Sequence, residues 1–163
     1  MNKPSVYIET SIISYLTARP SPSLLTAACQ QITMDWWEKR RGGFDLFTSE
    51  IVMLEARNGD PDAVARRLEI LRGIAELILT DRAKELARMF LVKRAVPPKA
   101  QADALHIAAA AVHRMDYLLT WNCRHINNPE IKPAIREVCE SMGVSCPEIC
   151  TPIEIVEIGY GRR

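Results

Sequence analysis

Residues 99–113 read KAQADALHIAAAAVH, and after a short turn residues 117–120 read YLLT. The first stretch places apolar residues on almost every side of a helix, which is typical of a helix that protein covers all round. The second stretch is a short apolar run of the kind found in a buried strand. A buried helix followed by a buried strand predicts a layered domain in which helices cover a parallel sheet.

The same alternation of strand and helix continues along the whole chain. Proline and glycine residues mark the boundaries between the elements. The predicted helix starts are Ser23, Thr48 or Ser49, Asp60 or Pro61, and Thr80 or Asp81, most of which can cap the helix that follows. Further strands are predicted at 5–8, 44–47, 75–79 and 149–150, and helices at 10–16, 24–41, 48–57, 60–71, 80–93 and 133–142. Strands that alternate with helices in this way predict one three-layer α/β domain over residues 1–163.

Composition excludes several classes of protein. Hydrophobic residues make up 48% of the 163 residues and charged residues 25%, which is ordinary for a globular domain. The net charge of +1 gives no overall attraction to nucleic acid, so any such binding must come from local basic patches. The longest uncharged apolar run, 107–112, is too short to span a membrane, and the first residues lack a signal-peptide layout. We therefore expect a cytoplasmic protein without a membrane partner.

Four acidic or amide side chains stand where apolar segments begin or end. Glu9 follows the strand 5–8, Asn122 follows 117–120, Glu55 lies on the helix after the second strand, and Asp103 opens the buried helix. Ligands of parallel sheets bind at the carboxyl ends of the strands. A carboxylate beside apolar residues is costly to bury unless positive charge compensates it. These positions therefore predict a site that gathers carboxylates around a cation.

Glu9 and Glu55 each have a purely structural alternative. Glu9 can cap the following helix, although Thr10 and Ser11 are better capping residues and lie beside it. Glu50 competes with Glu55, but five helical residues turn the two side chains apart by roughly 140°. Glu50 stands at the helix start, where the helix dipole alone favours an acid. Glu55 is therefore the predicted site residue.

The other two positions, Asp103 and Asn122, are also open to two interpretations, and so is His106, which lies near Asp103 in the sequence. Asp103 can be a dipole partner at its helix start, but the burial of this helix favours a function for its charge. His106, one turn further, is either a hydrogen-bonded core histidine or a residue that orients Asp103 or contacts substrate. Asn122 is either a plain turn residue or a source of a carbonyl oxygen and an amide donor.

Three carboxylates within a few ångströms repel one another strongly, and a hard divalent cation removes that penalty. Mg²⁺ prefers oxygen ligands, and no pair of histidines or thiols near these positions indicates zinc. The five cysteines also lack the paired spacing of a zinc ribbon. A cation held in this way supports hydrolysis of phosphodiesters without a side-chain nucleophile.

Four segments in this order resemble the PIN-domain nucleases, in particular the VapC-like toxins of bacterial and archaeal toxin–antitoxin pairs. They are YIETS at 7–11, SEIVMLE at 49–55, ADALHIAAA at 102–110 and YLLTWN at 117–122. The resemblance implies a three-layer α/β/α PIN-like domain with a central parallel sheet of about five strands. It also implies cleavage of single-stranded RNA with Mg²⁺ or Mn²⁺. Glu9, Glu55 and Asp103 would be the metal ligands, and Asn122 would join them as the fourth catalytic position.

Two residues depart from the pattern of that family. Glu9 stands where the family usually has aspartate, and Asn122 stands at a position that is usually acidic. The loss of one charge predicts a single firmly bound ion. Our main hypothesis is a metal-dependent endoribonuclease that is the toxin of a type II pair, with an antitoxin partner.

The alternative is a catalytically weakened PIN-like module that binds RNA or protein. A phosphomonoesterase is a weaker hypothesis, because no loop with a covalent nucleophile is evident. The resemblance further implies a homodimer, for which an exposed Trp36–Trp37 pair offers a patch, although one of the two residues is more simply explained as a core residue.

Overall fold

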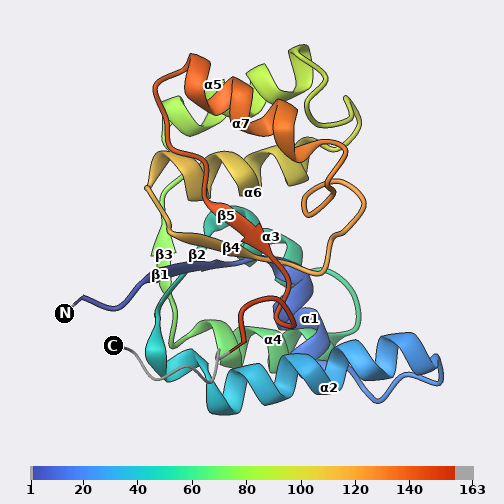
Figure 1. Ribbon diagram of the computed structural model, residues 1–163. Coiled ribbons are helices and arrows are strands. Elements are labelled where there is room, and N and C mark those ends of the chain that lie inside the picture. Colours follow the sequence, from blue (N-terminus) through green and yellow to red (C-terminus); the bar gives the residue numbers. More distant parts are fainter. Residues whose placement is uncertain (1, 157–163) are drawn as a thin grey trace.

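A computed structural model describes residues 2–156 and contains one sheet of five parallel strands (Figure 1). The strand order is β3-β2-β1-β4-β5, and every neighbouring pair is parallel. The strands are β1 (Ser5–Ile8), β2 (Asp45–Ser49), β3 (Ala75–Leu77), β4 (Tyr117–Leu119) and β5 (Glu148–Cys150). Residue 1 and residues 157–163, which the predicted domain includes, lie outside the described part.

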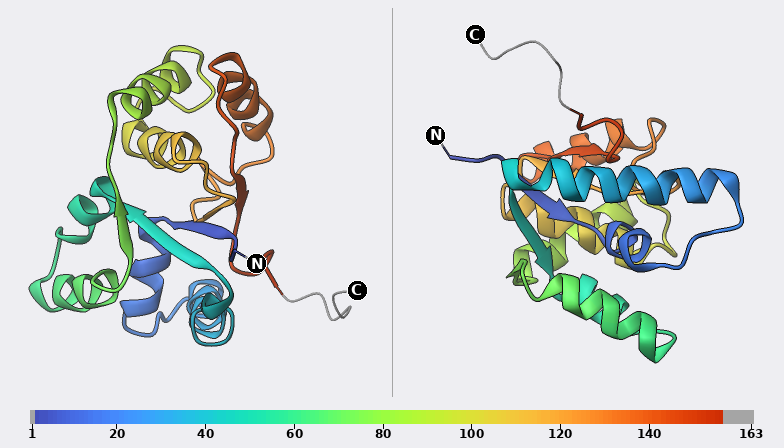
Figure 2. Two further views of the ribbon diagram at one scale, coloured as in Figure 1. Left: turned by 90° about the vertical axis from the view of Figure 1, so that its left-hand side faces the viewer. Right: turned by 90° about the horizontal axis from the view of Figure 1, so that it is seen from below.

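Helices cover both faces of the sheet, which gives the predicted three layers (Figures 1 and 2). One layer contains α1 (Thr10–Thr17), α2 (Leu24–Lys39) and α4 (Pro61–Leu71), and the other contains α5 (Asp81–Val92), α6 (Gln101–Val112) and α7 (Lys132–Ser141). The short helix α3 (Glu50–Ala56) follows β2 directly, and a 3-10 turn, η1 (Arg41–Gly43), precedes β2. Within residues 2–156, no helix has the length and apolar character needed to cross a membrane.

The chain changes direction across the sheet between β1 and β4. From β1 it moves outward to β2 and β3, and it later returns to add β4 and β5 on the other side of β1. In open parallel sheets, this switch point is where ligands bind, because the loops above the two adjacent strands diverge. The backbone N–H of Glu9 donates to the carbonyl of Leu119 at 3.1 Å, so the carboxyl ends of the two strands are joined there.

The predicted buried helix is the core of its layer. Its fully buried residues include four consecutive alanines, so the backbone of α6 packs closely on its surroundings; these residues are Ala104, His106, Ile107, Ala108, Ala109, Ala110 and Ala111. Small side chains allow this close approach without voids. The rigid packing of α6 also fixes the positions of the polar residues that it carries.

The structure decides two alternatives that the sequence leaves open. Trp36 is a core residue with 3% of its surface exposed, and Trp37 is partly buried with the Arg41 guanidinium 4.7 Å from its ring centroid. The two residues therefore do not form an exposed aromatic pair. Ser49 occupies the N-cap position of α3, but its side chain makes no capping hydrogen bond, because its hydroxyl bonds to Tyr7 Oη instead.

Candidate metal centre

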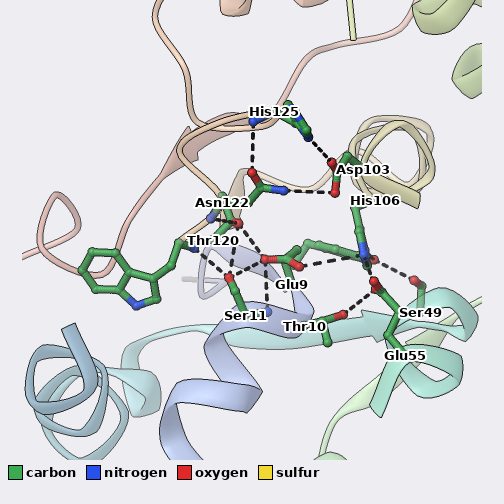
Figure 3. A network of polar contacts seen from close by, with 12 residues as sticks. Glu9, Thr10, Ser11, Ser49, Glu55, Asp103, His106, Thr120, Asn122 and His125 are labelled. Atoms are coloured by element: carbon green, nitrogen blue, oxygen red, sulfur yellow. Dashed lines mark hydrogen bonds and ion pairs between the residues drawn. The ribbon is translucent and has the colours of Figure 1, made fainter. Parts of the chain in front are cut away.

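The site lies at the carboxyl ends of the central strands, where α6 passes over them (Figure 3). Glu9 follows β1, Thr120 follows β4, and α3, which begins directly after β2, carries Glu55. The first half of α6 contributes Asp103 and His106. Residues that are far apart in the sequence therefore meet at the switch point of the sheet.

Glu9 has one engaged carboxylate oxygen and one that faces the site. Oε2 accepts hydrogen bonds from the backbone N–H and the hydroxyl of Ser11 and, at 2.6 Å, from Thr120 Oγ1. Glu9 is thus the N-cap of α1, a role that we had expected Thr10 or Ser11 to fill. Within residues 2–156, Oε1 receives no hydrogen bond, and it lies 3.9 Å from His106 Nε2. The capping role and a ligand role therefore use different oxygens of one buried carboxylate.

Glu55 is held from two sides. Its Oε1 accepts a hydrogen bond from Thr10 Oγ1 at 2.7 Å and lies 2.6 Å from His106 Nε2. Burial raises the pKa of Glu55, but the hydrogen bond and positive charge of His106, together with the Thr10 hydroxyl, outweigh it and lower the pKa below 4.5. Glu50, the competing acid, is exposed and accepts from the backbone N–H of Leu79. The structure therefore places Glu55, and not Glu50, beside Glu9.

His106 is completely buried and faces both glutamates. Its Nδ1 is hydrogen bonded to Tyr7 Oη at 2.8 Å, and the same hydroxyl is bonded to Ser49 Oγ at 2.6 Å. Burial lowers the pKa of His106, but its hydrogen bond to Glu55 and the nearby charges of Glu9, Glu55 and Asp103 raise it above 6.5. The expected core histidine is thus part of the site, where it bonds to Glu55 and not to Asp103.

Asp103 belongs to a second group of side chains. Its Oδ1 accepts a hydrogen bond from Asn122 Nδ2 at 3.0 Å, and its Oδ2 lies 3.0 Å from His125 Nδ1. Asn122 Oδ1 in turn accepts from the backbone N–H of His125, which closes a ring of three residues. Asn122 was expected here. His125 was not, because nothing in the pattern around residue 125 distinguishes it from a loop residue.

The donor atoms suit a divalent cation. Ligand atoms of Glu9, Glu55 and His106 lie within 4.8 Å of one another, and two of the three residues are buried. Carboxylate oxygens are the ligands that Mg²⁺ and Mn²⁺ take, and imidazole nitrogen is a ligand of transition metals. The structure brings Glu9 and Glu55 together as expected, adds His106 to them, and holds Asp103 beside them through its own partners.

Comparison with known proteins supports the fold. No family model matches the chain, and no curated protein matches its sequence. Solved structures that match include two with a TM-score of 0.58 each. VapC20 of Mycobacterium tuberculosis, a sarcin-ricin loop cleaving toxin, is 16% identical and covers 74% of this chain and 92% of its own. VapBC2 of Rickettsia felis, solved with a DNA fragment from its promoter, is 14% identical. The match covers 90% of this chain and 97% of the VapBC2 chain. This chain therefore has the fold of the VapC-like PIN domains.

Proposed function

We propose that this protein is a metal-dependent endoribonuclease that hydrolyses phosphodiester bonds of single-stranded RNA. The observation that carries the proposal is the convergence of Glu9, Glu55 and His106 at the switch point of a PIN-type sheet, with Asp103 beside them. Protonated His106 compensates the two carboxylates in the absence of metal, and a divalent cation bound between them would supply this positive charge instead. The similarity of the fold to a toxin described as cleaving the sarcin-ricin loop favours RNA as the substrate.

Each residue has a role in this proposal. Glu9, Glu55 and Asp103 hold Mg²⁺ or Mn²⁺ either directly or through water. When bound, such an ion favours ionisation of water and offsets the negative charge that builds up on a phosphodiester under attack. Asn122 and Thr120 keep the acids in place, since Asn122 donates to Asp103 and Thr120 donates to Glu9. The exposed Arg124, two residues after Asn122, is proposed to contact the RNA backbone.

The test is cleavage of a labelled single-stranded RNA by the purified protein with Mg²⁺ or Mn²⁺, and with EDTA as the negative control. Asp103→Ala should reduce the rate by about 10- to 100-fold, the scale found when groups that support a metal site are removed. Glu50→Gln is the matched control, because this exposed acid lies outside the site and its loss should leave the rate unchanged. Cleavage that persists unchanged in Asp103→Ala would contradict the proposal.

A second function is a PIN-like module that binds RNA or protein without catalysis. The observation in its favour is that both oxygens of Asp103 already have partners, Asn122 and His125. Calorimetric titration with Mn²⁺ separates the two functions, because a non-catalytic module should show no saturable binding at the glutamates. Saturable binding together with cleavage favours the nuclease.

The nuclease is further proposed to be a cytoplasmic toxin with a protein antitoxin and to act as a homodimer. The similarity to VapBC2, a toxin–antitoxin assembly, motivates the partner. Growth arrest on expression of the protein alone, relieved by co-expression of the reading frame next to its gene, is the expected result. Elution at monomer size over a wide range of concentrations would contradict the homodimer.

A further inference from the structure

We propose that His106 Nε2 is a direct ligand of the cation together with Glu9 and Glu55, so that the site has a mixed nitrogen and oxygen donor set. Asp103 then lies outside the direct ligands and acts through water or on the substrate. The inference rests on the proposed function, because it assigns the metal site of that same nuclease. It predicts that the site selects first-row transition-metal ions over Mg²⁺.

The first support is the geometry of the donor atoms. His106 Nε2 lies 2.6 Å from Glu55 Oε1 and 3.9 Å from Glu9 Oε1. Two ligands of one cation, each bound at about 2.1 Å, lie between about 3 and 4 Å apart. Small side-chain adjustments therefore allow one ion to contact all three residues once His106 has released its Nε2 proton to solvent, so that the lone pair of Nε2 can bind the ion.

The second support is the orientation of the imidazole. A ligating histidine usually has its other ring nitrogen hydrogen bonded, which fixes the direction of the ligating atom. His106 Nδ1 has this bond, to the buried Tyr7 hydroxyl that Ser49 holds in turn. Because Tyr7 lies on the central strand and His106 on the packed helix α6, the ring has little freedom, and Nε2 faces the two glutamates.

The third support is the state of Asp103. Its Oδ1 and Oδ2 are both occupied, by Asn122 Nδ2 and His125 Nδ1. Glu9 Oε1, in contrast, has no hydrogen-bond donor among residues 2–156. Within residues 2–156, the group of ligand atoms that lie within 4.8 Å of one another contains Glu9, Glu55 and His106 but not Asp103, so a cation at the glutamates meets His106 as its third protein ligand.

The consequence for metal choice follows from ligand chemistry. Mg²⁺ takes oxygen ligands and keeps its waters, whereas imidazole is a favourable ligand for transition metals. Affinity for nitrogen-containing sites also rises from Mn²⁺ to Co²⁺. A site with His106 as ligand should therefore bind Co²⁺ and Mn²⁺ more tightly than Mg²⁺, and this preference should depend on the imidazole.

The test uses the full chain, freed of metal with EDTA and loaded with Mn²⁺. Electron spin echo envelope modulation detects a histidine nitrogen bound to Mn²⁺. We expect the nitrogen modulation in the wild-type protein and its loss in His106→Gln. The chain has three histidines, so His125→Gln and His113→Gln are matched controls that should keep the modulation. Wild-type protein labelled with ¹⁵N only at histidine should change its modulation frequency, which tests the ligand without any mutation.

Calorimetry gives the second readout. We expect the ratio of Co²⁺ to Mg²⁺ affinity to fall at least about tenfold in His106→Gln. Saturable Mn²⁺ binding without histidine modulation, in a protein that cleaves RNA, would overturn this inference and leave the proposed function intact. Modulation that disappears in His125→Gln would overturn it as well. Absence of saturable binding together with absence of cleavage would overturn both the inference and the proposed function.

Discussion

Asn122 Nδ2 donates a hydrogen bond of 3.0 Å to Asp103 Oδ1 and so links the loop after β4 to the first turn of α6. The amide supplies a donor at a position where an acid would repel Asp103. This contact stabilises the protein in the absence of a cation, because it satisfies a carboxylate with little exposure to solvent. It also reduces the negative charge that is available to a second ion.

Asn122→Asp should lower the stability of the metal-free protein and raise its affinity for Mn²⁺. We expect the free energy of unfolding in EDTA to fall by roughly 2 kcal/mol, because a hydrogen bond to a charged group is replaced by repulsion between carboxylates. Mn²⁺ should stabilise the variant more than the wild type. Urea unfolding with and without Mn²⁺ measures both effects. Asn58→Asp, in an exposed turn, is the control and should change stability by less than about 0.5 kcal/mol. Unchanged stability of Asn122→Asp in EDTA would contradict this prediction.

The pair of His106 and Glu55 predicts how the stability of the metal-free protein depends on pH. Glu55 has a lowered pKa, so its contribution is present above its ordinary value of 4.5 and is lost as the pH falls. His106 has a raised pKa, so its contribution is present below its ordinary value of 6.5 and is lost as the pH rises through the raised value. The pair should therefore stabilise the fold most between these two values.

Urea unfolding in EDTA at about pH 5.5 and about pH 8.5 measures this effect. The wild-type protein should lose more stability than His106→Gln between the two conditions. The comparison removes contributions from the other histidines, which both proteins share. An equal change in the two proteins would show that the pair is not ionised as described.

Tyr7→Phe should destabilise the fold. The Tyr7 hydroxyl joins Ser49 Oγ and His106 Nδ1 in the core, and its removal leaves both without that partner. We expect a loss of about 1–3 kcal/mol in the free energy of unfolding. Tyr15→Phe is the control, because Tyr15 is only half-buried and stacks on Trp121 through its ring. The control should change stability by less than about 0.5 kcal/mol. Similar losses in both variants would argue against the buried network.

Ala110→Leu tests the close packing of α6. Ala110 is fully buried, so a larger side chain must push its neighbours away, at a cost of about 1–3 kcal/mol. Ala65→Leu, at an exposed position of α4, is the matched control and should be nearly neutral, since both residues favour helices. Thermal unfolding of the two variants provides the measurement. A neutral Ala110→Leu would mean that α6 has free space beside it.

The layers and the strands follow from local patterns, which is why the sequence predicts them well. The strand 5–8 has its predicted bounds, and the caps Ser23, Asp60 and Thr80 bond to their helices as expected. The helix after Ser49 has a feature that the local sequence does not predict. Its predicted capping hydroxyl bonds instead to Tyr7, which comes from another strand, and only the packed sheet brings the two together.

The candidate site is predicted in part for the same reason. Helical and strand positions place Glu9, Glu55 and Asp103 at one end of the sheet, because each is tied to an element boundary. The contact of His125 with Asp103 depends on the path of the loop after β4, which has no periodicity to interpret. The direction of His106 depends on Tyr7, 99 residues away in the chain. Tertiary contacts of this kind leave no local signal.

The position of β1 at the centre of the sheet has a consequence for synthesis of the protein. Glu9 and Glu55 are translated before β4, the strand that pairs with the other side of β1, and before the Thr120 hydroxyl that holds Glu9. A nascent chain that ends before this point lacks the pairing of β1 with β4 and the Thr120 hydrogen bond to the Glu9 carboxylate. Glu9 can gain this hydrogen bond only after residues 117–120 have emerged from the ribosome, so the candidate site of a protein that is proposed to attack RNA cannot form before its own strand β4 has been translated.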